Sequence, residues 1–192
     1  MVCCMDRFNF LIDLKIGGIY AAVVPVGIYL TNNSQTCMYI ADHSECGCLV
    51  LDSLEQYKKY DFSKLKNLKA VVLTCELDPK QLNSLVNPYV TVYSWQNFVD
   101  IGKNAKVDLA FKQRKEMQNP GNCCNIVYTS GTTGVPKAVM LSHDNMTWTV
   151  RCIRNMSTQI EDRQRCVSFL PLSHIAGQIV DIMCISTVYL YF

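Results

Sequence analysis

The chain has 192 residues and a formal net charge of +2, and 49% of its residues are hydrophobic while 18% are charged. This balance excludes a disordered chain, and the absence of any dense run of Lys and Arg gives no support to a nucleic-acid-binding protein. The composition therefore predicts a globular protein with enough apolar material for a substantial core.

Eleven cysteines, an odd number, include the adjacent pairs Cys3-Cys4 and Cys123-Cys124. None of them has the Cys-x-x-Cys spacing of zinc or redox sites, and no metal-ligand cluster is visible in the sequence. The pattern favours free, mostly buried thiols in a reducing compartment.

No signal peptide is expected, and the apolar run over residues 16–30 contains Pro25 and falls short of the ~20 residues that span a bilayer.

The first half of the chain alternates between helical and strand patterns. Apolar residues from Phe8 to Ile19 recur at three- and four-residue steps, which predicts a helix. Strands are expected at 23–29, 48–52, 69–74 and 89–93, and further helices at 35–44, 54–60, 79–85 and 95–101. A loop over 31–34 supplies the N-cap of the second helix, and Ser53 and Ser94 are expected to cap later helices. This alternation predicts an α/β fold with a largely parallel sheet and flanking helices.

The second half begins with a polar stretch, residues 103–121, which is expected to be a surface connection. A buried strand at 125–128 and a second strand at 138–141 follow, with Ser142 as the N-cap of the next helix and Asp144 in its favourable first turn. The apolar segment 175–192 contains Gln178 and Asp181 and is expected to form a core helix that leads into a strand.

Between those two strands lies the segment that carries chemistry. Residues 129–134 consist of hydroxyl side chains and two glycines, a composition that suits neither a helix nor a strand. Such a loop can direct backbone N–H groups at one anion, and Lys137, held behind the stiff Pro136, adds positive charge. Composition alone leaves a solvated Ser/Thr/Gly turn as an equal alternative. The separation of Gly134 from Lys137 argues against a Walker-type loop, which requires Gly-Lys-Ser/Thr in succession.

The segment Tyr128–Lys137 is similar, residue for residue, to the phosphate-loop signature of the adenylate-forming superfamily. Residues 170–175 resemble the next motif of long-chain acyl-CoA synthetases, and with 141–145 they look most like the bubblegum-type enzymes. Residues 27–34 and 39–45 resemble the region that precedes the loop in those enzymes, so the similarity covers nearly the whole chain.

The resemblance implies an incomplete N-terminal domain of the adenylate-forming fold. Residues 1–102 would be the α/β part before the loop, 103–121 the polar connection, and 122–192 the loop with the following helix and strand. The C-terminal domain with its catalytic lysine, the later adenine and ribose motifs and the magnesium-binding glutamate are expected to be absent. The implied reaction joins a long-chain fatty acid to CoA with ATP, releasing AMP and pyrophosphate, with Mg²⁺ as the cofactor.

Site residues follow from the same resemblance. A run of residues would cradle the β- and γ-phosphates of ATP: Thr129, Ser130, Gly131, Thr132, Thr133 and Gly134. Lys137 would neutralise charge on the phosphates, and His174 would lie near the acyl and adenylate pocket, with a histidine bonded only to the local backbone as the alternative. His143 is expected in the first turn of a helix, His43 on a solvated helix face and Trp148 in the core.

Two positions depart from the family pattern. Ala138 stands where the family usually has Gly, which would be strained if the site needs a positive φ or close packing. Gly177 stands where many relatives carry a carboxylate.

Three hypotheses remain open: an inactive piece of a fatty acid–CoA ligase, a non-catalytic binder of nucleotide phosphate or of a partner protein, or a non-functional fragment that aggregates through its sheet edge. Cytoplasmic localisation is expected, with peripheral association with the endoplasmic reticulum or another membrane suggested by the fatty-acid substrate. Chain-length preference and oligomeric state are not indicated by the sequence.

Overall fold

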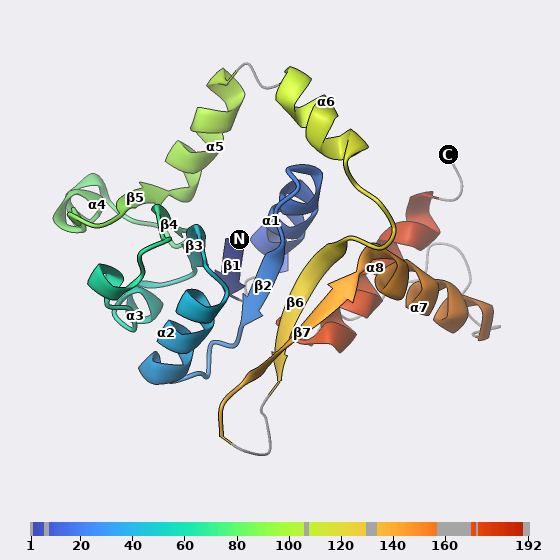
Figure 1. The fold of residues 1–192 in the computed structure, drawn as a ribbon. Helices are drawn as coiled ribbons and strands as arrows, with labels where there is room; N and C mark the ends of the chain where they lie inside the picture. Colours follow the sequence, from blue (N-terminus) through green and yellow to red (C-terminus); the bar gives the residue numbers. More distant parts are fainter. Residues whose placement is uncertain are drawn as a thin grey trace.

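A computed structural model describes residues 2–5, 8–105, 108–129, 134–156, 170–171 and 173–189 of the protein. The described part is built around one sheet with helices against both of its faces (Figure 1).

The sheet has seven strands in the order β5-β4-β3-β1-β2-β6-β7. Their bounds are β1 (Val2–Met5), β2 (Pro25–Ile28), β3 (Cys48–Leu51), β4 (Ala70–Leu73), β5 (Thr91–Ser94), β6 (Cys123–Thr129) and β7 (Lys137–Ser142). Every neighbouring pair is parallel except β6 and β7, which are antiparallel. The predicted α/β class with a largely parallel sheet is confirmed.

Strand β1 was not predicted from the sequence. It lies inside the sheet, where Val2 pairs with Pro25 of β2 on one side and with Cys48 of β3 on the other. Val2–Met5 is a continuous apolar run, but a run of only four residues does not distinguish a buried strand from part of a helix.

Alternating residues of each strand face opposite helical layers. Val26 and Ile28 of β2 are fully buried in the main core against Cys37 and Ile40 of α2 (Ser34–His43). On the other face, Val72 packs with Leu14 of α1 (Phe8–Tyr20) and Phe98 of α5 (Trp95–Asn104). The short helices α3 (Leu54–Tyr57), η1 (Phe62–Lys64) and α4 (Pro79–Ser84) lie between the strands of the first half. Period-two strands buried on both faces are typical of a parallel sheet covered by helices.

Two of the helix starts have their predicted caps, Ser53 and Ser94, whereas α2 begins one residue earlier than predicted and is capped by Asn33. The side chains of Asn33, Ser53 and Ser94 each accept a hydrogen bond from a backbone N–H in the first turn of the following helix. Helix α3 ends at Tyr57, earlier than predicted, since the chain tightens into turn bonds such as Lys59 N–H to the Gln56 carbonyl.

The expected polar connection contains a helix, α6 (Asp108–Glu116). Its Phe111 ring lies 5.9 Å from the ring of Tyr20 on α1, and Lys115 Nζ lies 5.9 Å from the centroid of the same tyrosine ring. These contacts attach an otherwise exposed and polar helix to α1, which is tertiary information that composition does not carry.

The last two helices are α7 (His143–Met156) and α8 (Ile175–Tyr189), which pack together (Figure 1). Trp148 is 62% exposed, so the prediction that it belongs to the core was wrong, because Met146 and Val150 form the buried face of α7. The strand expected after α8 falls on residues 190–192, outside the described part, and the helix runs to Tyr189. Among the described helices, none combines the length and apolar character needed to cross a membrane.

Candidate nucleotide-phosphate site

The predicted phosphate loop is the connection of the β6–β7 hairpin, which projects beyond the rest of the sheet (Figure 1). Strand β6 is buried from Cys124 to Tyr128 and becomes exposed at Thr129. Tyr128 pairs with Ala138, and Thr129 pairs with Lys137. The antiparallel ladder therefore brings the two ends of the motif opposite each other and closes the loop at its base.

Thr129 and Lys137 lie on the same face of this ladder, because directly paired residues of antiparallel strands point to the same side. Both are exposed. Gly134 has φ of +91°, a backbone conformation that glycine adopts easily and other residues rarely do. The remaining predicted cradle residues, Ser130, Gly131, Thr132 and Thr133, lie outside the described part of the chain.

His43 contacts the start of the motif. Its Nδ1 atom lies 2.8 Å from the hydroxyl oxygen of Tyr128, which is 4% exposed. The two rings meet edge to face at 5.9 Å, and the ring of Tyr39 contacts both. His43 is exposed on α2, as predicted, and the contact with Tyr128 is a feature that the sequence did not indicate. No signal within the sequence links these residues, which are far apart along the chain.

The second motif is brought to the same region of the sheet. Ser173 is buried and packs against Gly27 of β2, where an added Cβ would lie 2.8 Å from the Ser173 Cα atom. Gly27 pairs with Val127, two residues before Thr129. The two motifs thus meet near the carboxyl ends of β2 and β6, where ligands of parallel α/β sheets usually bind.

His174 sits at the amino terminus of α8. Its Nδ1 atom accepts a hydrogen bond from the Ala176 backbone N–H at 3.1 Å, and the ring is exposed. When Nδ1 accepts a hydrogen bond, the proton of the neutral ring is on Nε2, which is then a donor. His174 thus caps the start of α8 through Nδ1, and its Nε2–H group is not used in that cap.

The two departures from the family pattern have separate explanations. Gly177 is buried, and a Cβ there would lie 2.6 Å from the Pro171 carbonyl oxygen and 2.9 Å from that of Leu170. The close approach of backbone to helix leaves no room for a side chain. Ala138 is an exposed strand residue whose φ is not positive, so the strain considered for it does not arise.

The remaining sequence expectations concern α7 and metals. Ser142 caps α7, because its Oγ accepts from the Asn145 N–H at 3.1 Å while Asn145 Oδ1 accepts from the Ser142 N–H at 3.0 Å. His143 is the first residue of α7, as predicted.

Across the described ranges, no three His, Cys, Asp or Glu side chains are grouped so that they could hold a metal ion.

The sequence from residue 13 to residue 188 matches the model of the AMP-binding enzyme family. The chain therefore belongs to the AMP-binding enzymes, and the expected family is confirmed.

Among curated proteins, the chain is 38% identical over 190 residues to the long-chain-fatty-acid–CoA ligase ACSBG2 of Gallus gallus, covering 93% of this chain and 24% of that protein. It is also 38% identical over 175 residues to the long-chain-fatty-acid–CoA ligase ACSBG1 of Homo sapiens, covering 87% of this chain and 23% of that protein. The chain thus spans about a quarter of the length of these relatives.

Solved structures agree on the fold. The A-PCP didomain of carboxylic acid reductase from Segniliparus rugosus, in complex with AMP, superposes with a TM-score of 0.75 at 17% identity over 97% of this chain and 28% of that chain. A fatty acyl CoA synthetase of Mycobacterium tuberculosis gives a TM-score of 0.62 at 17% identity over 97% of this chain and 32% of that chain. At such identity the likeness concerns the fold alone.

Proposed function

We propose that the protein supplies the ATP-phosphate loop of an AMP-forming long-chain fatty acid–CoA ligase. The observation that carries the proposal is the antiparallel pairing of Thr129 with Lys137, which closes the motif into a hairpin loop with a hydroxyl and an ammonium group on one face. Both relatives reported above are named as ligases of this type.

The residue types of the motif suit a polyphosphate. Backbone N–H groups, hydroxyls and a lysine charge are the groups that stabilise a phosphate chain. In this proposal the loop from Thr129 to Gly134 holds the β- and γ-phosphates, and the exposed Lys137 neutralises their charge. In the same proposal His174, near the same end of the sheet, would use its Nε2 donor to orient a carboxylate or phosphoryl oxygen.

Mg²⁺ and CoA are parts of the same proposal. Mg²⁺ usually binds through substrate phosphates with one or two carboxylates, and it would screen the charge of the phosphates. The described loop residues supply no carboxylate, so the ion would arrive with ATP. The carboxylate of the fatty acid would attack the α-phosphate and expel pyrophosphate, giving acyl-AMP. The thiol of CoA would then lose its proton, attack the acyl carbonyl carbon and expel AMP.

The test is isothermal titration of the 192-residue chain with ATP in magnesium buffer, comparing the natural protein with Lys137→Ala and Lys80→Ala. Lys80 is an exposed lysine of α4, beside β5 at the opposite edge of the sheet, and it serves as the matched control. A charge-assisted contact contributes about 1.5–3 kcal/mol, so Lys137→Ala should weaken binding roughly 10- to 100-fold.

Two results would decide the matter. Weaker binding in Lys137→Ala and unchanged binding in Lys80→Ala support the loop as the phosphate site. Equal effects of both substitutions, or no binding by a chain that circular dichroism shows to be folded, overturn it.

Catalysis is a separate question, because the chain spans about a quarter of its relatives' length. We propose that the 192 residues bind the nucleotide without forming acyl-CoA by themselves. The test is to assay a purified preparation, free of other synthetases, for the formation of acyl-CoA, and product formation would contradict the proposal.

A cytoplasmic protein associated peripherally with membranes fits a fatty-acid substrate, and co-sedimentation with phosphatidylcholine vesicles would test the association.

A further inference from the structure

Lys59 fastens the segment of chain that leaves β2. Its Nζ atom donates to the backbone carbonyls of Leu30 and Asn32, at 2.8 Å each. Nε2 of Gln56 donates to the same Leu30 carbonyl at 3.3 Å. The segment that accepts these bonds, residues 29–33, joins β2 to α2 and is named the β2–α2 turn. Three hydrogen bonds from α3 and the residues after it therefore hold two carbonyl groups of one turn.

The ammonium group of the half-buried Lys59 is directed at this turn. Within the described part of the chain, it forms no ion pair with a carboxylate. A lysine usually keeps its charged end in water, and hydrogen bonds from a charged donor are about twice as strong as neutral ones. The turn's own backbone bond, from the Asn32 N–H to the Tyr29 carbonyl, is longer at 3.1 Å. Lys59 is thus a main determinant of where the turn lies.

The β2–α2 turn leaves the sheet at the edge that carries the phosphate loop (Figure 1). In the parallel pairing of β2 with β6, Gly27 lies opposite Val127. Two residues further along each chain segment come Tyr29, the first residue of the turn, and Thr129, the first residue of the proposed cradle. The turn therefore follows β2 at the level where the phosphate motif follows β6.

The turn also sets the start of α2. Asn33, its last residue, caps the helix by accepting a hydrogen bond from the Thr36 N–H at 2.9 Å. The other end of α2 carries His43, whose Nδ1 atom lies 2.8 Å from the hydroxyl oxygen of Tyr128. A displaced turn would consequently disturb the phosphate motif from two sides, through the end of β2 and through α2.

We propose that Lys59 is a positioning residue for the nucleotide-phosphate site, which it acts on by holding the β2–α2 turn in place. The inference rests on the proposed function, because the site that it concerns is the proposed ATP site. Lys59 acts through the turn, since two of its three N–H groups are engaged by the carbonyls of Leu30 and Asn32.

The first measurement needs no nucleotide. Hydrogen–deuterium exchange of the peptide 29–37 is followed by mass spectrometry in the natural 192-residue chain and in Lys59→Met, which keeps a long side chain but has no donor. Exchange should become about tenfold faster or more, because hydrogen bonds from a charged group contribute that factor or more to an equilibrium. Lys59→Arg, which keeps the charge and the donors, should remain close to the natural chain.

The second measurement is isothermal titration of the same proteins with Mg-ATP. Lys59→Met should bind roughly fivefold more weakly or worse, the lower end of typical couplings between sites, and Lys59→Arg should restore the affinity.

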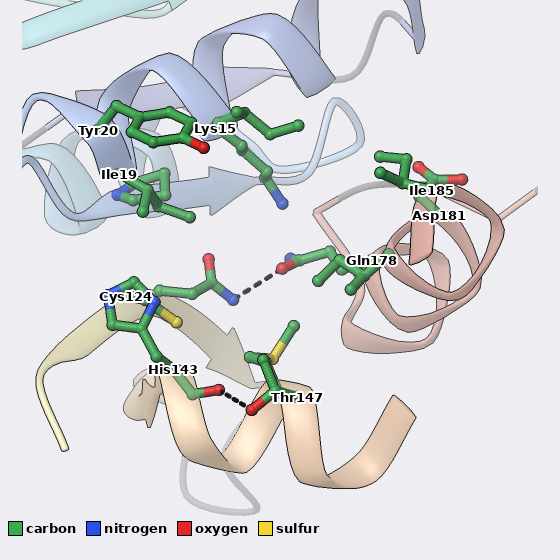
Figure 2. Close-up of a pocket in the computed structure, with 14 residues that line it drawn as sticks. Lys15, Ile19, Tyr20, Cys124, His143, Thr147, Gln178, Asp181 and Ile185 are labelled. Carbon is green, nitrogen blue, oxygen red and sulfur yellow. Dashed lines mark hydrogen bonds between the residues drawn. The ribbon is translucent and has the colours of Figure 1, made fainter. Parts of the chain in front are cut away.

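Two controls separate positioning from loss of charge and from loss of stability. Lys15→Met removes another half-buried lysine, which lines a pocket of about 300 Å³ at the opposite end of β6 (Figure 2). Asp78→Ala removes the cap of α4, beside β5 at the far edge of the sheet, where Asp78 Oδ1 accepts from the Gln81 N–H at 2.7 Å. Both should leave the affinity for Mg-ATP unchanged.

Each outcome decides. Unchanged exchange in Lys59→Met overturns the inference about Lys59 alone, whether or not ATP binds. Faster exchange with unchanged affinity, or an equal loss of affinity in Asp78→Ala, shows that the turn does not position the site and also overturns it. If the natural chain does not bind Mg-ATP, the proposed function fails and the positioning role fails with it.

A milder variant covers the case in which Lys59→Met does not fold. Gln56→Leu removes only the hydrogen bond from Gln56 to the Leu30 carbonyl. It should speed exchange of the peptide 29–37 and weaken Mg-ATP binding, each by a smaller factor than Lys59→Met. No change in either quantity would overturn the proposal.

Discussion

Nδ1 of His43 and the hydroxyl oxygen of Tyr128 lie 2.8 Å apart, joining the last turn of α2 to the first residue of the phosphate motif. Tyr39 completes an aromatic cluster, with its ring 5.2 Å from His43 and 6.4 Å from Tyr128. The hairpin that carries the loop is thereby fastened to the helical layer on one face of the sheet. The base of the loop is held by tertiary contacts as well as by its own ladder.

A double-mutant cycle should detect this attachment. Tyr128→Phe and His43→Ala each remove one partner, and we expect a coupling energy of about 1 kcal/mol in the free energy of unfolding, since a net hydrogen bond contributes about 0.5–1.5 kcal/mol. Urea denaturation followed by circular dichroism measures it. Tyr89→Phe, at a tyrosine that is 61% exposed, is the control and should leave stability unchanged. Strictly additive effects of the two substitutions would show that the pair does not interact.

The conformation of Gly134 should make it intolerant of a side chain. With φ of +91°, Gly134→Ala is expected to lose about 1 kcal/mol of stability and, under the proposed function, to weaken the affinity for Mg-ATP. Gly121→Ala is the matched control, because both glycines are exposed with open space around the missing Cβ and only Gly134 has positive φ. If the two substitutions change the free energy of unfolding equally, the positive φ of Gly134 does not strain an alanine at that position.

Gly177 should also be intolerant of a side chain, in its case because neighbouring backbone atoms occupy the space. Gly177→Ala places a Cβ against the carbonyl oxygens of Leu170 and Pro171, which are backbone atoms and cannot rotate away. Overpacking of this kind costs about 1–3 kcal/mol. Gly17→Ala, within α1 and free of neighbours, should instead stabilise by about 0.5–1 kcal/mol. Thermal and urea denaturation of both variants would reveal the opposite signs, and a stabilising Gly177→Ala would refute the contact.

Burial raises the pKa of the Cys124 thiol to about 11, with the neighbouring Cys123 adding to the effect. The raised pKa keeps the thiol protonated at pH 8, so its thiolate fraction is about 100-fold lower than that of a thiol at the usual value near 9. In a Cys123→Ser background, alkylation of Cys124 by iodoacetamide should be slow at pH 8 and should accelerate about tenfold for each pH unit up to pH 10. Peptide mass spectrometry measures the rate, and a rate independent of pH would argue against a buried thiol that titrates high.

Sequence reasoning anticipated most of the sheet because its strands are short apolar runs bounded by turn residues. The runs around Val50, Val72 and Val127 were all placed, as were caps such as Ser94. Failures occurred where tertiary contacts decide. Helix α6 depends on Tyr20 of α1, and the exposed position of Trp148 depends on which face of α7 meets the core.

The site was accessible from the sequence only in part. The spacing of Gly134, Pro136 and Lys137 is local and could be recognised as a motif. The contact of His43 with Tyr128 and that of Ser173 with Gly27 join distant segments, which a single sequence cannot pair.

The position of β1 has a consequence for how the sheet assembles. In the described part of the chain, β2 and β3 do not pair with each other, and each is hydrogen-bonded to β1. Residues 2–5 therefore act as a seam between the β5-β4-β3 ladder and the β2-β6-β7 ladder that carries the phosphate loop. Until β1 has paired with both β2 and β3, the two ladders are not joined into one sheet. A substitution in β1 that weakens its pairing would therefore loosen the attachment of the ladder that carries the phosphate loop, although the loop is far along the chain.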